Sequence, residues 1–157
     1  MTKGSDHPNI NRYIHPPLVM LAHLLAAFLL NWLLPLPIAS PKFSEWTGYL
    51  LVFVGLGFAF SAVSQFGKMH TTLDPHGSVS AIIISGPYRF SRNPIYLGFV
   101  CILIGLPLAV GNYWGAALSP LLMVLFYQLV IKHEEAYLEG KFQDVYTRYK
   151  SRVRRWL

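Results

Sequence analysis

The longest uncharged run of the chain constrains its fold more than any other feature. From Asn93 to Ile131 no Asp, Glu, Lys or Arg occurs over 39 consecutive positions. A helix needs about 20 apolar residues to cross the ~30 Å hydrocarbon core of a bilayer, so the run is too long for one crossing and suits two. Gly111-Asn112 supplies the turn residues expected between them. The run therefore predicts two spans, near residues 95–110 and 114–131.

Two further uncharged runs precede it, from Tyr13 to Pro41 and from Trp46 to Gly67. They predict spans near residues 17–34 and 46–66, joined by a proline-rich turn. Hydrophobic residues make up 54% of the chain and charged residues 13%, far from the average soluble domain. The predicted fold is an all-α membrane protein with four transmembrane helices, forming a single domain over residues 1–157.

The distribution of basic residues predicts the orientation. If both termini are cytoplasmic, twelve of the thirteen Lys and Arg residues lie on that side and only Lys42 lies outside, as the positive-inside rule requires. In a bacterium the membrane would be the inner membrane. The basic residues behind the net charge of +6 then set the orientation and contact anionic head groups. Membrane lipids are therefore expected partners, and nucleic acid is not. The sequence predicts no metal site, since no compact ligand motif occurs.

The tail from Lys132 to Leu157 is polar and differs from the spans. Its apolar residues recur at the spacing i, i+4, i+7, i+11, which predicts an amphipathic helix that packs over a cytoplasmic loop. These residues are Leu138, Phe142, Val145 and Tyr149. At its end, Arg152, Arg154, Arg155 and Trp156 are typical of an interfacial anchor.

Arg89 and Arg92 lie in a loop directly before the long apolar run. Pro87 and Pro94 bracket them and bias the preceding residues away from helix, so an ordered loop is expected, with a helix starting near Pro94. A guanidinium placed in hydrocarbon costs at least ~2.5 kcal/mol, so each arginine must reach the interface or a partner. A functional site is one explanation and a head-group contact is the other.

This loop resembles the signature of the isoprenylcysteine carboxyl methyltransferase family, which has relatives among phospholipid N-methyltransferases. The matching residues are Gly86-Pro87-Tyr88-Arg89, then Arg92-Asn93-Pro94, then Tyr96 and Gly98. A second matching block contains His133-Glu134-Glu135-Ala136-Tyr137-Leu138, followed by Phe142, Tyr146, Tyr149 and Arg152-Val153. The chain departs from the family in three places: Asn93 replaces a frequent His, Gln143 a common Gly, and Arg154 a common Pro.

The resemblance implies an enzyme that transfers a methyl group from S-adenosylmethionine to a lipophilic acceptor entering from the bilayer. The implied acceptor is a carboxylate such as that of a prenylated cysteine. Carried onto this chain, the expected catalytic residues are Arg92, Arg152 and Glu135. The expected cofactor-binding residues are Gly86, Pro87, Tyr88, Asn93, Pro94, Tyr96, Leu97, Gly98, Glu134, Glu135 and Tyr149.

Charge supports this assignment, because carboxylates suit the cationic parts of the cofactor and an arginine suits a carboxylate. Two alternatives stay open. The enzyme could instead methylate an amine, as a phospholipid N-methyltransferase does. A protein of another class, a non-catalytic four-helix membrane subunit, would have the same hydropathy.

Overall fold

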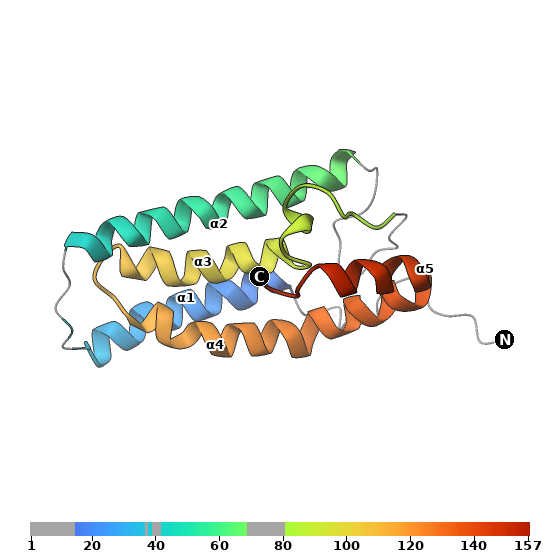
Figure 1. The fold of residues 1–157 in the computed structure, drawn as a ribbon. Coiled ribbons are helices and arrows are strands. Elements are labelled where there is room, and N and C mark those ends of the chain that lie inside the picture. Colours follow the sequence, from blue (N-terminus) through green and yellow to red (C-terminus); the bar gives the residue numbers. More distant parts are fainter. Residues whose placement is uncertain (1–14, 37, 39–41, 69–80) are drawn as a thin grey trace.

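The computed structural model describes residues 15–36, 38, 42–68 and 81–157, and within these ranges the chain forms helices and turns without strands. Figure 1 shows the long helices lying side by side. The elements in chain order are α1 (Pro16–Leu33), α2 (Lys42–Lys68), the 3-10 turn η1 (Gly86–Arg89), α3 (Pro94–Leu108), α4 (Trp114–Phe126), the π-helical turn η2 (Tyr127–Ile131) and α5 (Lys132–Arg152). The predicted roles of Lys3, Arg12 and residues 69–80 fall outside the described residues.

Three of the described helices are long and apolar enough to cross a membrane: Pro16–Leu33, Lys42–Gly67 and the continuous helix that starts at Trp114. The fourth predicted span, α3, is apolar but has only 15 residues. The predicted fourth span ends at residue 131, and the helix continues beyond it, because η2 joins α4 to α5 without interruption. A π turn inserts one residue into a helix, and such turns often occur next to functional sites.

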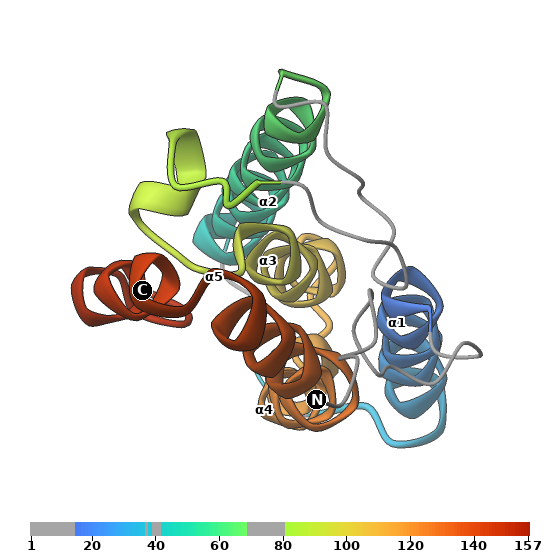
Figure 2. The ribbon, with the colours of Figure 1, turned by 90° about the vertical axis from the view of Figure 1, so that its right-hand side faces the viewer.

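The short helix α3 lies at the centre of the bundle, as the end-on view in Figure 2 shows. One buried cluster joins α3 to α4 and η2, and part of α1 packs against it. Its fully enclosed members are Leu103, Leu122, Phe126, Val130 and Ile131. Since α3 is largely covered by its neighbours, its length need not match the bilayer as closely as that of a lipid-exposed helix.

Glycines bring α2 and α3 into direct backbone contact. A Cβ atom at Gly55 would lie 2.7 Å from the carbonyl oxygen of Gly98, and one at Gly98 would lie 2.6 Å from that of Gly55. Gly48 and Gly105 form the same reciprocal contact, each 2.7 Å from the other's oxygen. Gly48 and Gly55 therefore pack against α3, because small residues at both crossings let the helices approach. Gly57 on the same helix makes no such contact, since a Cβ atom there would meet nothing within 4 Å.

The predicted turn at Gly111-Asn112 is confirmed and also holds α1 in place. Gly111 has a φ of +76°, a conformation that favours glycine. The buried Asn112 side chain donates to the carbonyl oxygen of Ala27 at 3.0 Å and accepts from the backbone nitrogen of Trp114 at 2.9 Å. The turn thus fixes the start of α4 and the middle of α1 together.

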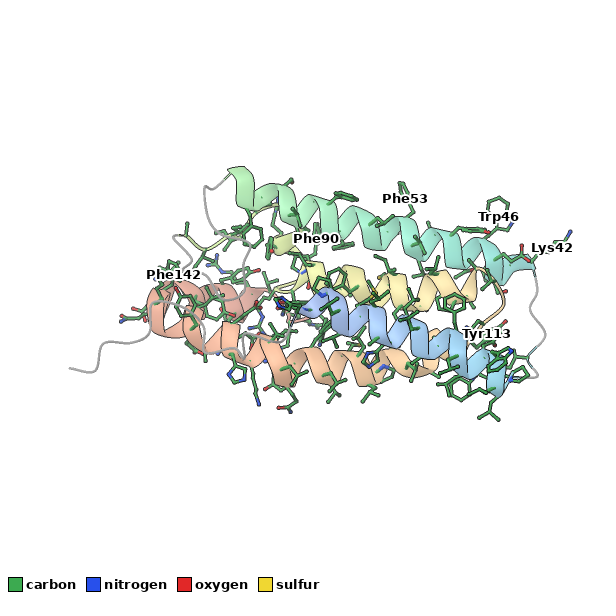
Figure 3. The ribbon with its side chains drawn as sticks, turned by 180° about the vertical axis from the view of Figure 1, so that it is seen from behind. Lys42, Trp46, Phe53, Phe90, Tyr113 and Phe142 are labelled. Atoms are coloured by element: carbon green, nitrogen blue, oxygen red, sulfur yellow. The ribbon has the colours of Figure 1, made fainter. Side chains whose placement is uncertain are left out.

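The two ends of the bundle differ in character. Figure 3 shows Lys42, Trp46 and Tyr113 at one end and Phe142 at the other. The arginine-bearing loop and α5 share the Phe142 end (Figure 1). The residues that form the two sequence blocks are therefore gathered at one end of the molecule.

Candidate active site

The arginine-bearing loop is anchored on the end of α2 before it enters α3. Gly86 has a φ of +60°, and a Cβ atom there would lie 2.9 Å from the side-chain nitrogen of Gln65. The Ser85 hydroxyl donates to Gln65 Oε1 at 3.1 Å. The ring of Tyr88 meets that of Phe66 edge-on, with centroids 6.2 Å apart. Gly86 is therefore needed for the path of the loop backbone, because glycine adopts a positive φ readily and leaves room for the Gln65 side chain.

The helix α5 folds back on itself at Gln143, where φ is 41° and ψ is −118°. Figure 2 shows its two halves as separate rods, and Lys150 Nζ lies 3.0 Å from Glu139 Oε1 across the bend. This corrects the prediction of one continuous amphipathic helix. Val145, predicted on the apolar face, is 51% exposed, because the bend turns the second half of α5 against the loop.

Hydrogen bonds from both side chains and the backbone hold this second half, and the residues that follow it, on the loop. The Tyr149 hydroxyl donates to the carbonyl oxygen of Tyr88 at 2.7 Å. The backbone nitrogen of Arg92 donates to the carbonyl oxygen of Arg154 at 3.0 Å, and Asn93 Nδ2 donates to that of Arg155 at 3.1 Å. The tail therefore packs over the loop, as predicted, with its last residues closest to Arg92.

Glu135 lies between two arginines. Arg155 donates from Nε to Oε1 at 3.1 Å and from Nη2 to Oε2 at 2.8 Å, the two-pronged geometry that suits a carboxylate. Arg92 Nη1 approaches Oε1 at 3.0 Å from the other side. The Arg155 guanidinium also lies over the ring of Tyr127, 4.6 Å from its centroid, a favourable cation–π contact. We call Arg92, Glu135 and Arg155 the ion cluster.

The Arg92 side chain is only 9% exposed, and its Nε and Nη1 atoms donate no hydrogen bond to any described residue. The short contact of Nη1 with Glu135 is thus an ion pair that lacks hydrogen-bond geometry. A buried N–H group without an acceptor costs about 1–3 kcal/mol. Two guanidiniums against one carboxylate also leave the ion cluster with a net positive charge. Both features suit an anionic ligand at Arg92.

A second carboxylate, Glu134, lies beyond the apolar segment 114–131 and contacts α3. The Tyr96 hydroxyl donates to Glu134 Oε1 at 2.9 Å. Burial raises the pKa of Glu134 from 4.5 to about 7, the hydrogen bond from Tyr96 lowers it, and the nearby charge of Glu135 raises it further. A cation next to Glu134 would favour its ionised form.

Other predicted site residues have structural contacts. Gly98 packs against α2, Pro94 and Leu97 are buried at the start of α3, and Pro87 is buried in η1. The Asn93 amide and the Tyr149 hydroxyl hold the tail on the loop. Three of the predicted cofactor-binding residues keep a polar role at the site. Tyr96 is hydrogen-bonded to Glu134, and Glu135 is part of the ion cluster.

The structure does not bring Arg152 into the ion cluster; its side chain is exposed. Arg155, which the sequence predicted as a membrane anchor, occupies the place next to Glu135. The signal that could have found it was Gln143. A position where related proteins have glycine marks a possible reversal of the chain, and a reversal there brings residues near 155 back toward 135.

A family model described as phospholipid methyltransferase matches residues 43–145, a range that includes the arginine-bearing loop and both carboxylates. The protein-S-isoprenylcysteine O-methyltransferase of Schizosaccharomyces pombe is 30% identical over 115 residues, which cover 71% of this chain and 49% of that protein. The chain thus spans about half the length of this relative.

An uncharacterized protein of Haemophilus influenzae is 41% identical over 63 residues, which cover 40% of this chain and all of that protein. No solved structure matches the chain significantly. The family model covers well over half of the chain, and its matched range contains most of both sequence blocks. The predicted resemblance is confirmed, and the chain belongs to the phospholipid methyltransferase family.

Proposed function

We propose that the protein is an integral-membrane methyltransferase that uses S-adenosylmethionine to methylate a lipophilic acceptor. The observation that carries this proposal is the ion cluster, in which Nε and Nη1 of the buried Arg92 donate no hydrogen bond to a described residue. Membership of a methyltransferase family supports the reaction class. The acceptor we favour is a carboxylate whose hydrophobic chain stays in the bilayer while its reactive end reaches Arg92.

The described residues fit both reactants by charge. Glu134 would hold the ammonium group of the cofactor, since its Oε1 accepts from the neutral Tyr96 hydroxyl, whereas the Glu135 carboxylate is bonded to Arg155. Arg92 would bind the acceptor carboxylate through its unpaired N–H groups. Arg155 would keep Glu135 in place, so that Glu135 neutralises part of the charge without occupying the remaining N–H groups of Arg92.

When bound, S-adenosylmethionine would supply the methyl group of its sulfonium centre: the carboxylate oxygen would bond to the methyl carbon as the carbon–sulfur bond breaks, and S-adenosylhomocysteine would leave. The carboxylate is already ionised near neutral pH and needs no general base. What the protein must do is hold the acceptor oxygen in line, about 3–3.5 Å from the methyl carbon, and exclude water. The tail packed over the loop would provide the exclusion, and Arg92 the alignment. The exposed Arg152, which the sequence predicted as catalytic, is less well placed than Arg155 to contact Glu135.

We also propose that α1, α2, α3 and α4 all cross the membrane, with both termini in the cytoplasm. The gathering of the loop and α5 at one end of the bundle supports this orientation (Figure 1). Cysteines introduced singly at Lys42 and Lys150 test it. In sealed inner-membrane vesicles with the cytoplasmic face outward, an impermeant thiol reagent should label position 150 and not position 42. The reverse pattern would contradict the orientation.

The family match favours one second candidate, methylation of a phospholipid amine. An amine must lose its proton before it attacks, so its methylation should rise steeply with pH, whereas carboxylate methylation should not. Arg92→Lys should abolish transfer to a prenylcysteine analogue, because a point charge does not reproduce the guanidinium geometry. Arg148→Lys, at an exposed position of α5, is the matched control. Full activity of Arg92→Lys would favour the amine.

The primary test is calorimetric binding of S-adenosylhomocysteine to the purified protein in detergent. We expect saturable binding that Glu134→Gln weakens and Glu45→Gln, at the far end of α2, leaves unchanged. Absence of binding at millimolar ligand would refute the proposal and favour a non-catalytic membrane subunit.

A further inference from the structure

A groove of about 530 Å³ opens on the outer face of α2, beside the arginine-bearing loop. Residues of α2 between Phe53 and Ser61 form one wall, and Pro87, Arg89 and Phe90 form the other. Figure 3 shows Phe53 on the outer side of α2, pointing away from the bundle. The rings of Phe53 and Phe90 are 76% and 66% exposed, so both are available to an apolar ligand.

The floor of this groove is open because α2 carries a glycine there. A Cβ atom at Gly57 would meet nothing within 4 Å, in contrast to Gly48 and Gly55 on the same helix, which pack against α3. Gly57 therefore has no packing role among the described residues. It does line the groove, where a larger side chain would take up the space.

The groove follows α2 from Phe53 to Ser61, a distance of eight residues or about 12 Å along a helix. Gln65, one turn beyond Ser61, anchors the loop at the upper end through Ser85. This length is within half of the ~30 Å hydrocarbon core of a bilayer. A chain lying in the groove would run from the interface toward the middle of the membrane.

Arg89 gives the upper end of the groove a positive charge. Its side chain is exposed, and no ion pair within 4.0 Å joins it to a carboxylate of the described residues. It thus differs from Arg92, three residues later, which is buried next to Glu135. An arginine at this depth contacts lipid head groups and favours anionic ones.

We infer that this groove binds an anionic membrane lipid, with one hydrocarbon chain along Phe53, Gly57 and Phe90 and its head group at Arg89. The site thus combines an open floor at Gly57, aromatic walls and a charge at one end. The inference goes beyond methyl transfer. It rests only on the membrane insertion proposed above, and the lipid need not be the acceptor.

The test uses phosphatidylglycerol with a photoreactive diazirine in one acyl chain, added to phosphatidylcholine vesicles that contain the full-length protein. After irradiation, mass spectrometry should locate the label in peptides that contain residues 53–61 and 86–90. Gly57→Leu, which fills the floor, should reduce this labelling several-fold. Gly67→Leu on the same helix is the matched control, since a Cβ atom there also meets nothing within 4 Å and Gly67 does not line the groove.

The charge is tested separately. Arg89→Gln should lower labelling by phosphatidylglycerol about fivefold, the effect of one basic residue near an anionic surface. Arg148→Gln, which removes an exposed charge from α5, should leave it unchanged. Label spread equally over α1, α2 and α4, or equal labelling of the Arg89→Gln and original proteins, would overturn the inference. So would equally strong labelling of the groove by photoreactive phosphatidylcholine.

Binding of S-adenosylhomocysteine, measured on the same preparations, separates this inference from the proposed enzyme activity. The Gly57→Leu and Arg89→Gln proteins should bind it as the original protein does, since neither residue is assigned to the cofactor or to the ion cluster. Retained binding also shows that the variants are folded. A protein that labels as expected without binding S-adenosylhomocysteine would support the lipid site and contradict the proposed function.

Discussion

At the scale of single residues, the assignment of charges at the candidate site depends on Arg155. This side chain holds Glu135 by two hydrogen bonds and stacks on Tyr127, so Glu135 is already engaged. Glu135 therefore fits a role in orienting Arg92 better than the direct cofactor contact predicted from the sequence. The family resemblance predicted that Arg92 and Glu135 belong to one site, and charge assigned them to different ligand groups rather than to each other. The third member, Arg155, was not predicted, because only the bend of α5 at Gln143 brings it next to Glu135.

Arg155→Lys tests this arrangement. A lysine cannot make both hydrogen bonds to Glu135, which would then turn toward Arg92 and occupy its free N–H groups. We expect the KM for a prenylcysteine analogue to rise about tenfold or more, the effect of a lost hydrogen bond to a charged group. Binding of S-adenosylhomocysteine through Glu134 should change little.

The matched control for Arg155→Lys is Arg152→Lys, three residues earlier and exposed. If Arg152→Lys impairs acceptor binding and Arg155→Lys does not, the sequence prediction for Arg152 was right and the role given to Arg155 is wrong.

The raised pKa of Glu134 gives a second prediction at this scale. Its folded pKa of about 7 lies above the ordinary 4.5 because burial disfavours the ionised form. An ammonium ligand needs that ionised form, so binding must release a proton when the pH is below 7. Affinity for S-adenosylhomocysteine should therefore increase as the pH rises from about 5.5 to 8 and then level off.

Calorimetry at several pH values provides the measurement, and Glu134→Gln should remove the increase. The other groups facing Glu134 are the Tyr96 hydroxyl, Tyr88 and Glu135, and neither tyrosine ionises in this range. An unchanged pH profile in Glu134→Gln would mean that Glu134 does not contact the ammonium group.

At the scale of elements, hydropathy predicted each described helix to within a few residues, apart from the start of α2 and the ends of α4 and α5. The apolar run ends at Ile131, and the predicted fourth span ends there. The helix in fact continues, because the backbone hydrogen bonds of a helix do not depend on the surrounding solvent. A change in composition marks where a helix leaves the membrane, and it does not mark where the helix stops.

The bend in α5 was missed for a different reason. The residue at the bend is Gln143, whose φ of 41° is unusual for any residue except glycine. Because no glycine marks the bend, the apolar spacing that continues through residues 138–149 predicts a straight helix. Local sequence pattern cannot reveal a strained residue that tertiary contacts hold in place.

Gln143→Gly should stabilise the protein by removing this strain. Residues held in such a conformation cost about 1–3 kcal/mol, and we expect a gain within that range. Thermal unfolding in detergent, followed by circular dichroism, measures it. Asp144→Gly is the control: it should lower the unfolding temperature, because the neighbouring exposed position has ordinary helical geometry and glycine there is unfavourable. Destabilisation by both substitutions would show that the bend is absent in solution.

At the scale of the whole molecule, the sequence predicted that both blocks lie at the same end, from the count of crossings alone. It could not predict how they meet. The contact is made by the backbone oxygens of Arg154 and Arg155 on residues 92 and 93, and such contacts leave no side-chain pattern to detect. The site is thus assembled from parts of the chain about sixty residues apart.

Two truncations test this assembly. A protein ending at Lys132 keeps all four apolar segments and should still enter the membrane, because hydropathy determines insertion. It should bind neither S-adenosylhomocysteine nor acceptor. A protein ending at Val153 keeps Glu134 and Glu135 and lacks Arg155, so it should bind S-adenosylhomocysteine and lose methyl transfer. Resistance to carbonate extraction measures insertion, and calorimetry measures binding. If the protein ending at Lys132 binds S-adenosylhomocysteine as well as the full chain does, the tail from residue 133 is only a membrane anchor and the site assignment is wrong.

The short central helix also makes the site sensitive to the thickness of the bilayer. With 15 residues, α3 is about 22 Å long, less than the ~30 Å core, while the rod from Trp114 to the bend in α5 is much longer. Arg92 precedes the short element and Glu135 lies on the long one. A thicker membrane would change the tilt of the rod more than it could stretch α3, and so would alter the distance between the two charges. The acyl-chain length of the surrounding lipids should therefore modulate catalysis even when acceptor and cofactor are saturating.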